Sequence, residues 1–241
     1  MEKNQSLTEH LAELRGRLIK SLWAILIGSI IAYGFSDYIF NFIREPAQQY
    51  LPSGGLVFTH PTDKFMAHLK IAFFAGISLS CPFWLYQLWA FIAPGLYQKE
   101  KRYATAFIST GSLLFMTGLS FCYFLVLPPA FQFFFNFGGD IDKPMITISE
   151  YLGFVVQMTV IFGVAFQLPL VLVLLGMMGI VSANFLRKKR RLSYFVLAIA
   201  SAFLTPTPDA LSMFLMLGPM MVLFELAIFF VARFEKKPVS T

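Results

Sequence analysis

The sequence predicts an all-α protein: a single integral membrane domain over residues 1–241 with six transmembrane helices. Of the 241 residues, 57% are hydrophobic and only 13% are charged, and the mean hydropathy is +0.69. Soluble domains have roughly 45–50% apolar and about 25% charged residues. Long apolar runs satisfy their backbone hydrogen bonds inside a bilayer by forming helices of about 20 residues. The runs here are too continuous for the alternating strands of a membrane barrel.

Six apolar runs define the predicted helices, and they cover residues 18–35, 65–92, 103–127, 151–180, 192–204 and 210–231. Pro82 interrupts the second run, and Pro169 lies near the middle of the fourth, where we expect a tilt or a kink. We expect the third helix to end at Pro128 and Pro129, because proline has no N–H group to donate inside a helix.

The fifth and sixth helices are expected to be short. Run 192–204 reaches only about 20 Å at about 1.5 Å per residue, which is less than the ~30 Å hydrocarbon core. The sixth run meets Glu225 after 15 apolar residues. Asp209 ends the proline-containing tip between the two helices. We therefore expect a thinned bilayer beside this hairpin.

The basic residues predict the topology. Fifteen of the 19 lysine and arginine residues fall in the two termini and in connectors 93–102 and 181–191. The opposite side holds only Arg44, Lys64, Lys70 and Lys143. By the positive-inside rule, both termini and these two connectors are cytoplasmic, and an even number of spans agrees with that.

The two outer connectors, 36–64 and 128–150, are more apolar than solvated loops. Each contains an aromatic stretch, at residues 38–43 and 131–135. Such stretches are typical of short amphipathic helices that lie in the membrane interface. We expect two interfacial helices that cap the outer side of the bundle.

Glu13 and Glu100 are the two acidic residues that we single out among the cytoplasmic cations. Ser6 and Glu9 form a capping box, which predicts a helix that begins near Leu7. On that helix Glu13 and Arg17 are spaced for an i, i+4 ion pair worth about 0.2–0.5 kcal/mol, and a solvated helix face is the simpler interpretation. The second acid, Glu100, follows an aromatic segment in connector 93–102, which also reads as a routine turn.

Polar residues inside the apolar runs are functional hypotheses, because an acid at a helix centre costs about 2.5–3.5 kcal/mol on insertion scales. Gln167 lies in the fourth run, two residues before Pro169. Its amide either serves a function or bonds the carbonyls that Pro169 frees. Glu225 in the sixth run is either functional or an interfacial acid whose carboxylate reaches the cytoplasmic headgroups.

Catalytic, metal and cofactor sites are not indicated. The three histidines and two cysteines are not grouped at metal-ligand spacing, and no protease, hydrolase or nucleotide-binding motif is present. The net charge of +6 is explained by membrane topology rather than by nucleic-acid binding. We expect a protein that is not an enzyme and that holds no cofactor.

Several motifs in order resemble the TatC family. They are residues 13–17 (ELRGR), residues 91–97 (FIAPGLY) with Glu100 and Arg102, residues 162–166 (FGVAF) with Pro169, and Thr205-Pro206 with Asp209. The resemblance extends from about Leu7 to Phe234.

The resemblance implies the receptor core of the twin-arginine translocase, which moves folded proteins across a prokaryotic cytoplasmic membrane with the proton-motive force. It implies that Glu13 and Glu100 receive the paired arginines of precursor signal peptides. The residues implied to shape or support that site are Arg17, Phe91, Pro94, Leu96, Tyr97 and Arg102.

The resemblance also implies partners: small single-span subunits of the TatA/TatB type, packed along the short fifth helix, and further copies in a larger complex. Gln167 departs from the family, because many members have Glu there. A glutamine side chain does not ionise, so the resemblance implies for Gln167 only a contact with the partner helices and no role that requires ionisation.

Two other classes of function stay open at this point. A secondary transporter of a small solute is the main alternative, because Pro169 and Pro219 can break helices near the midplane beside Gln167. No internal repeat or second midplane charge supports it. An intramembrane hydrolase is weaker still, because neither a nucleophile–base pair nor a pair of acids is visible.

Overall fold

The computed structural model describes residues 7–48, 55–92, 104–136, 145–206 and 209–234, and the regular secondary structure of this part is helical apart from one isolated bridge between Val57 and Thr147. Its elements in chain order are α1 (Leu7–Tyr33), α2 (Ser36–Arg44), the 3-10 turn η1 (Glu45–Ala47), α3 (Asp63–Leu79), α4 (Cys81–Ile92), α5 (Ala104–Phe121), the π-helical turn η4 (Cys122–Val126), α6 (Leu127–Asn136), α7 (Ile148–Ala165), α8 (Leu168–Met177), α9 (Ala183–Lys188), α10 (Arg190–Leu204) and α11 (Ala210–Phe234).

The all-helical membrane class is confirmed. Four segments are long and apolar enough to cross a bilayer, namely Leu11–Tyr33, Ala104–Asn136, Ile148–Met177 and Ala210–Phe234. The pair α3 and α4 makes a fifth if it counts as one bent span. α10 has 15 residues, so the expected short fifth helix is present, and its crossing of the bilayer stays a prediction.

The expectation of a short sixth helix is wrong. α11 has 25 residues, which makes it about 37 Å long at about 1.5 Å per residue. The helix continues past Glu225 because side chains of α10 bind that carboxylate. It also continues through Pro219, so this proline does not break the span.

The expectation that the third helix ends at Pro128 and Pro129 is also wrong. Helical structure is continuous over Ala104–Asn136. The π-helical turn η4 lies directly before the two prolines, and the Leu127 N–H group donates to the Cys122 carbonyl across it. This wider turn and the place of the prolines in the first turn of α6 accommodate their rings. Residues 131–135 are therefore helical as expected, but they extend α5 and do not form a separate cap.

The second predicted helix is bent by 54° between α3 and α4. The bend lies at Ser80, just before Pro82 in the first turn of α4. The Trp84 indole N–H group donates to the Ile77 carbonyl (3.2 Å), and the Ser80 hydroxyl donates to the same carbonyl (3.3 Å). The fourth predicted helix is likewise broken between α7 and α8, where Gln167 precedes Pro169.

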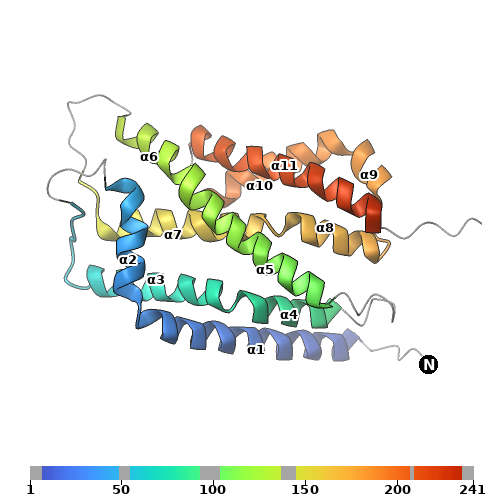
Figure 1. Ribbon diagram of the computed structural model, residues 1–241, viewed down its shortest axis with the longest axis horizontal. Coiled ribbons are helices and arrows are strands. Elements are labelled where there is room, and N and C mark those ends of the chain that lie inside the picture. Colours follow the sequence, from blue (N-terminus) through green and yellow to red (C-terminus); the bar gives the residue numbers. More distant parts are fainter. Residues whose placement is uncertain (1–6, 49–54, 93–103, 137–144, 207–208, 235–241) are drawn as a thin grey trace, which may run out of the picture.

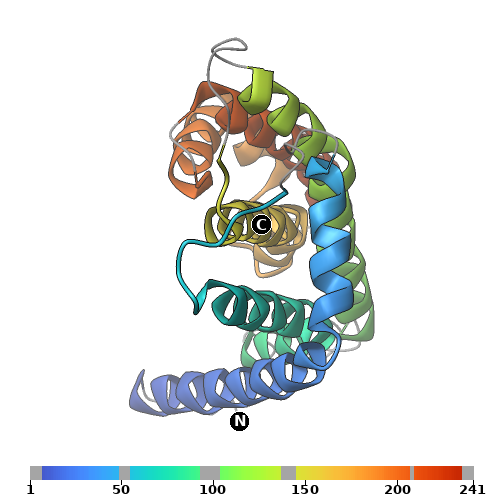
Figure 2. The same ribbon diagram turned by 90° about the vertical axis from the view of Figure 1, so that its left-hand side faces the viewer.

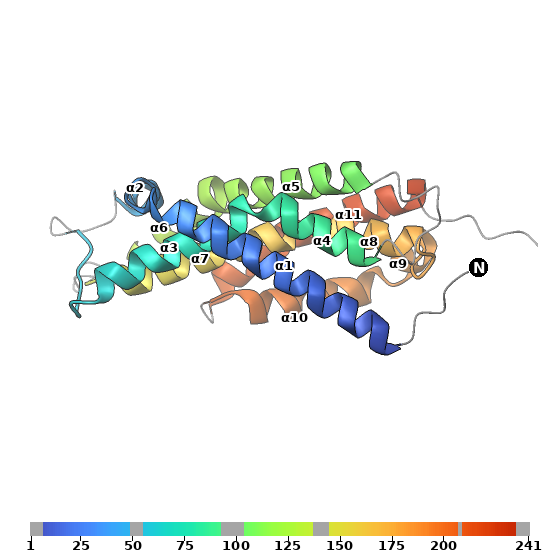
Figure 3. The same ribbon diagram turned by 90° about the horizontal axis from the view of Figure 1, so that it is seen from below.

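The helices form an elongated bundle with α7 and α8 at its centre (Figure 1). α1 crosses α3 and α4 obliquely on one side (Figure 3), while α11 packs on α8 and carries α9 and α10 on the other. α5 packs against α4 and α7. Seen along the bundle, α2 runs across one end from α1 towards α6 (Figure 2), which is the cap expected for the first outer connector.

The two ends of the bundle differ in the number of cations that they carry. The cation-rich end contains the starts of α1 and α5, the ends of α4, α8 and α11, and α9; the cation-poor end contains α2, the starts of α3 and α7, and the end of α6 (Figure 1). Of the twelve cations in the described residues, eight belong to the cation-rich end: Arg15, Arg17, Arg187, Lys188, Lys189, Arg190, Arg191 and Arg233. Lys20 lies at the midpoint of α1, and the remaining three are Arg44, Lys64 and Lys70.

Glycines allow two helix pairs to approach closely, as is typical of membrane bundles. In the contact between α1 and α3, a Cβ atom added to Gly76 would lie 2.3 Å from the Ser29 hydroxyl and 2.5 Å from the Ser29 nitrogen. Between α5 and α7, a Cβ on Gly118 would lie 2.6 Å from the Phe162 carbonyl oxygen. Both contacts require a residue without a side chain.

Candidate functional site

Glu13 and Arg17 form an ion pair on the first half of α1. The Arg17 Nε and Nη2 atoms both donate to Oε1 of Glu13, at 2.9 and 2.5 Å. The Glu13 side chain is 23% exposed and the Arg17 side chain 25%. The pair predicted from the i, i+4 spacing is therefore formed, and it holds the carboxylate by one oxygen in a partly shielded position.

The aromatic segment that the sequence placed beside this pair is described only at its start. Phe91 lies half-buried in the last turn of α4, at the cation-rich end. Five other predicted site residues lie outside the described residues: Pro94, Leu96, Tyr97, Glu100 and Arg102. Ile92 and Ala104, which flank their connector, both lie at the same end of the bundle as Glu13 (Figure 1).

Gln167 is buried at the break between α7 and α8, with 8% of its surface exposed. Its Nε2 atom donates to the Gly111 carbonyl of α5 at 2.9 Å, and its Oε1 atom has no hydrogen-bond partner. The interpretation that Gln167 serves the carbonyls freed by Pro169 is therefore wrong, because the amide group bonds a different helix. A Cβ at Gly111 would lie 2.9 Å from side-chain carbons of Leu85 and Leu170, so the surroundings of this carbonyl are tightly packed.

Glu225 joins α10 to α11. Arg190 donates to its Oε2 atom and the Tyr194 hydroxyl to its Oε1 atom, both at 2.5 Å. The Glu225 and Arg190 side chains are 38% and 47% exposed. Both Glu225 oxygens therefore bind the neighbouring helix, and the interfacial position of this acid stays a prediction. Asp209 has a local role, since its Oδ1 atom accepts from the Ser212 N–H group in the first turn of α11.

Residues that the sequence analysis missed tie α2 to the bundle at the cation-poor end. The Tyr123 hydroxyl donates to the Phe42 carbonyl (2.6 Å) and the Tyr151 hydroxyl to the Ile43 carbonyl (2.7 Å). The Tyr123 ring also stacks on Phe42 with centroids 4.4 Å apart. Tyrosines near the ends of apolar runs were the available signal, because a buried phenol needs a partner for its hydroxyl.

His68 adds a further tie from α3. Its Nδ1 atom is 3.1 Å from the Ser36 hydroxyl, and its Nε2 atom is 3.7 Å from Oδ1 of Asp37. The imidazole also stacks on Phe40. Nearby, Asp63 accepts hydrogen bonds from the backbone N–H groups of His60 and Thr59, and these bonds lower the pKa of the carboxyl group.

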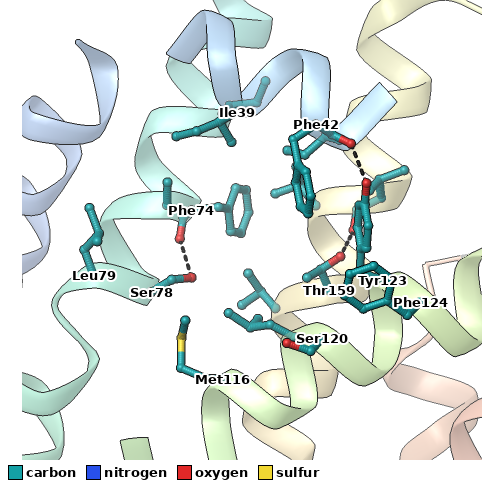
Figure 4. Close-up of a pocket in the computed structure, with 17 residues that line it drawn as sticks. Ile39, Phe42, Phe74, Ser78, Leu79, Met116, Ser120, Tyr123, Phe124 and Thr159 are labelled. Atoms are coloured by element: carbon teal, nitrogen blue, oxygen red, sulfur yellow. Dashed lines mark hydrogen bonds between the residues drawn. The ribbon is translucent and has the colours of Figure 1, made fainter. Parts of the chain in front are cut away.

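An apolar groove of about 400 Å³ lies beneath these ties, between α2, α3, α5 and α7 (Figure 4). Its few hydroxyl groups are largely occupied. Ser78 donates to the Phe74 carbonyl and Thr159 to the Val155 carbonyl, each one turn back on its own helix. The groove can therefore accommodate an apolar group, but its lining provides few free polar groups for hydrogen bonding or catalysis.

The described residues contain no group of three or more His, Cys, Asp or Glu side chains that could hold a metal ion. Two of the three supports for the transporter alternative are weakened, because Pro219 leaves α11 continuous and the buried Gln167 side chain bonds the Gly111 carbonyl. The helix break beside Pro169 is present. The geometry instead presents a charged, partly shielded carboxylate at the cation-rich end.

Comparison with known proteins identifies the family. The sequence model described as "Sec-independent protein translocase protein (TatC)" matches residues 9–219. The TatC protein of Carboxydothermus hydrogenoformans is 42% identical over 98% of this chain and 96% of its own length, and that of Escherichia coli is 38% identical over 95% and 89%. A crystal structure titled as the twin-arginine translocase receptor TatC superposes with a TM-score of 0.80 at 36% identity, covering 92% of this chain and 98% of that one.

These similarities extend over nearly the whole chain. They also agree with the membrane-spanning helices, which make the chain an integral protein of the bacterial inner membrane. The chain belongs to the TatC family of Sec-independent protein translocases, which are translocase receptors and not enzymes.

Proposed function

We propose that this chain is the receptor subunit of a twin-arginine translocase, with its cation-rich end in the cytoplasm, and that Glu13 and Glu100 bind the paired arginines of precursor signal peptides. In this proposal the chain crosses the membrane six times and both termini are cytoplasmic. The observation that carries the proposal is the position of the Glu13 carboxylate among the cations of that end, in a chain of the TatC family.

The orientation is supported by the distribution of charge. Eight of the twelve described cations belong to one end of the bundle, and an excess of lysine and arginine marks the cytoplasmic side of membrane proteins. The starts of α1 and α5 and the ends of α4 and α11 share that end. If the cation-rich end faces the cytoplasm, both termini and connector 93–102 are cytoplasmic as well.

The geometry of Glu13 suits an incoming arginine. Arg17 uses only Oε1 of the carboxylate, so Oε2 is the oxygen assigned to the signal peptide. Arginine makes forked hydrogen bonds to carboxylates, whereas lysine acts as a point charge. A precursor with two lysines should therefore bind more weakly.

Cations at the same end oppose the approach of an arginine pair. Screening over about 8 Å at physiological salt limits this repulsion. Recognition therefore depends on short-range bonds to the two carboxylates, each worth about 1.5–3 kcal/mol when a charged group takes part.

We assign the single-span TatA/TatB-type partners to α10, whose 15 residues give a helix of about 22 Å. A short helix favours a thinned bilayer beside it, and short partner helices match such a membrane. In this proposal Gln167 is not protonated or deprotonated. It affects assembly only through its hydrogen bond to Gly111 of α5. Further copies of the chain complete the complex.

Crosslinking of a twin-arginine precursor to the chain in membranes tests the proposal. Glu13→Lys and Glu100→Lys should each reduce crosslinking by about 10- to 150-fold, the equivalent of one charge-assisted bond. Glu45→Lys makes the same charge change at the cation-poor end and should have no effect. The Lys-Lys version of the precursor should crosslink weakly to every variant. Unchanged crosslinking in both the Glu13 and Glu100 variants would refute the site.

A further inference from the structure

A second apolar groove, of about 420 Å³, opens at the cation-rich end between α5, α8 and α11. α8 packs extensively on α11 but touches α5 only lightly, which leaves the space. Trp89 of α4 and Met177 of α8 are buried residues of its wall. Its rim is open to the membrane, since Leu226, Phe230 and Phe234 of α11 are 47%, 43% and 50% exposed.

The depth of this groove matches one leaflet of a bilayer. On α5 its lining runs from Ala106 to Leu114 and on α11 from Leu223 to Phe234, which are lengths of about 12 and 16 Å. Half of the ~30 Å hydrocarbon core is about 15 Å. A transmembrane helix of a partner needs a groove of the full thickness, whereas the acyl chain of a phospholipid needs only this depth.

The mouth of the groove carries positive charge. Arg233 lies in the last turn of α11, in i, i+3 and i, i+7 positions from the rim residues Phe230 and Leu226. Residues at these spacings share one side of a helix. The exposed Arg233 side chain therefore stands beside the groove, at the level where the lining ends. α9, with Arg187 and Lys188 in its last turn, packs on the same helix.

We propose that this groove binds an anionic phospholipid of the leaflet at the cation-rich end, with an acyl chain along Phe230 and Trp89 and the headgroup phosphate on Arg233. The apolar wall accepts the chain, the single-leaflet depth limits its length, and the arginine selects the negative headgroup. The site is independent of signal-peptide recognition, because none of its residues belongs to the carboxylate site.

Tryptophan fluorescence tests the site directly, because Trp89 reports from inside it. The protein is reconstituted in phosphatidylcholine that contains a small, equal mole fraction of either brominated phosphatidylglycerol or brominated phosphatidylcholine. Bromine quenches only indoles in near contact, and Trp89 is 3% exposed, so bulk lipid reaches it poorly. The contribution of Trp89 is the difference in quenching between the unmodified protein and the Trp89→Phe variant. We expect about fivefold stronger quenching by the anionic lipid, which corresponds to about 1 kcal/mol for one cation near the surface.

Two variants and a control make the result specific. Arg233→Gln should abolish the preference for the anionic lipid, and Ala106→Phe should fill the groove and remove the Trp89 signal for both lipids. Arg191→Gln, the same charge change at the same end on a helix that does not line the groove, should leave the preference intact. Equal quenching by the two lipids in the unmodified protein would overturn the proposal. So would Trp89 quenching that persists in Ala106→Phe while co-purification of a single-span partner is lost, which would assign the groove to that partner.

Discussion

The two ends of the bundle are held together differently. At the cation-poor end, α2 is tied to three segments distant in sequence, by Tyr123, Tyr151 and His68. At the cation-rich end, the two ion pairs in the described residues lie within α1 or between the consecutive helices α10 and α11.

The difference concerns burial as well as connectivity. Tyr123 and Tyr151 are 9% and 3% exposed, and a polar group that loses its partner inside the protein costs about 1–3 kcal/mol. The charged side chains of the two ion pairs are 23–47% exposed, and solvent-accessible pairs contribute about 0–1 kcal/mol. The cation-poor end therefore carries the interactions that fix the fold. The cation-rich end carries charges that cost little stability and remain available for binding.

The largest expected effect tests how α1 is attached to the bundle. Gly76→Ala should lower the free energy of unfolding by about 3 kcal/mol, because the new Cβ would meet backbone atoms of Ser29 at 2.5–2.7 Å. Gly153→Ala on α7 is the control, since a Cβ there meets nothing within 4 Å. Thermal unfolding of the purified protein measures both. Equal midpoints for the two variants would show that α1 is not held by this contact.

The next effect concerns the ties on α2. Tyr123→Phe and Tyr151→Phe should each destabilise the protein by about 1–2 kcal/mol, because the Phe42 and Ile43 carbonyls lose their hydroxyl donors. Tyr38→Phe changes a 78% exposed residue of α2 and should have no effect. The same thermal measurement applies, and binding of the precursor should not change. A loss of precursor binding without a loss of stability would contradict the conclusion that the cation-poor end stabilises the fold and the cation-rich end binds the precursor.

A smaller effect is expected for the link between α10 and α11. Arg190 and Glu225 are 47% and 38% exposed, so the coupling between them should not exceed about 1 kcal/mol. A double-mutant cycle with Arg190→Gln and Glu225→Gln measures it. A coupling of several kcal/mol would mean that this ion pair supports the fold as strongly as the tyrosine ties.

The smallest effect is a pH dependence at the cation-poor end. Hydrogen bonds from His60 and Thr59 lower the pKa of Asp63 in the folded state. The resulting stability is present above the unfolded pKa of about 4 and is lost as the pH falls through the folded value. Asp63→Asn should flatten the decline of the thermal midpoint below about pH 4. A decline of unchanged slope would assign it to other carboxyl groups.

Much of the fold followed from sequence because hydropathy and charge act over long segments. The apolar runs predicted the helical membrane class, and the spacing of Glu13 and Arg17 predicted their ion pair. The positions of the cations in the sequence predicted that the starts of α1 and α5 and the ends of α4, α8 and α11 lie at the same end of the bundle (Figure 1).

The failures have local physical causes. Pro128 and Pro129 looked like a helix end, but a π-helical turn before them keeps the helix continuous. Glu225 looked like a limit to the apolar length of α11, but groups on α10 satisfy it. One of the two interpretations of Gln167 had its amide bond the carbonyls freed by Pro169, and it bonds Gly111 of α5 instead. The outcomes for Glu225 and Gln167 depend on a tertiary partner, which one sequence does not identify, and the outcome for the two prolines depends on a local change of helix type.

The bend between α3 and α4 has a mechanical consequence. The Ile77 carbonyl there accepts bonds from Ser80 and Trp84, so the corner is braced from within and is not a free hinge. α1 packs against both α3 and α4, and Gly76 of α3 lies against Ser29 of α1. The helix that bears Glu13 is therefore seated on a corner whose angle is held by two side-chain hydrogen bonds.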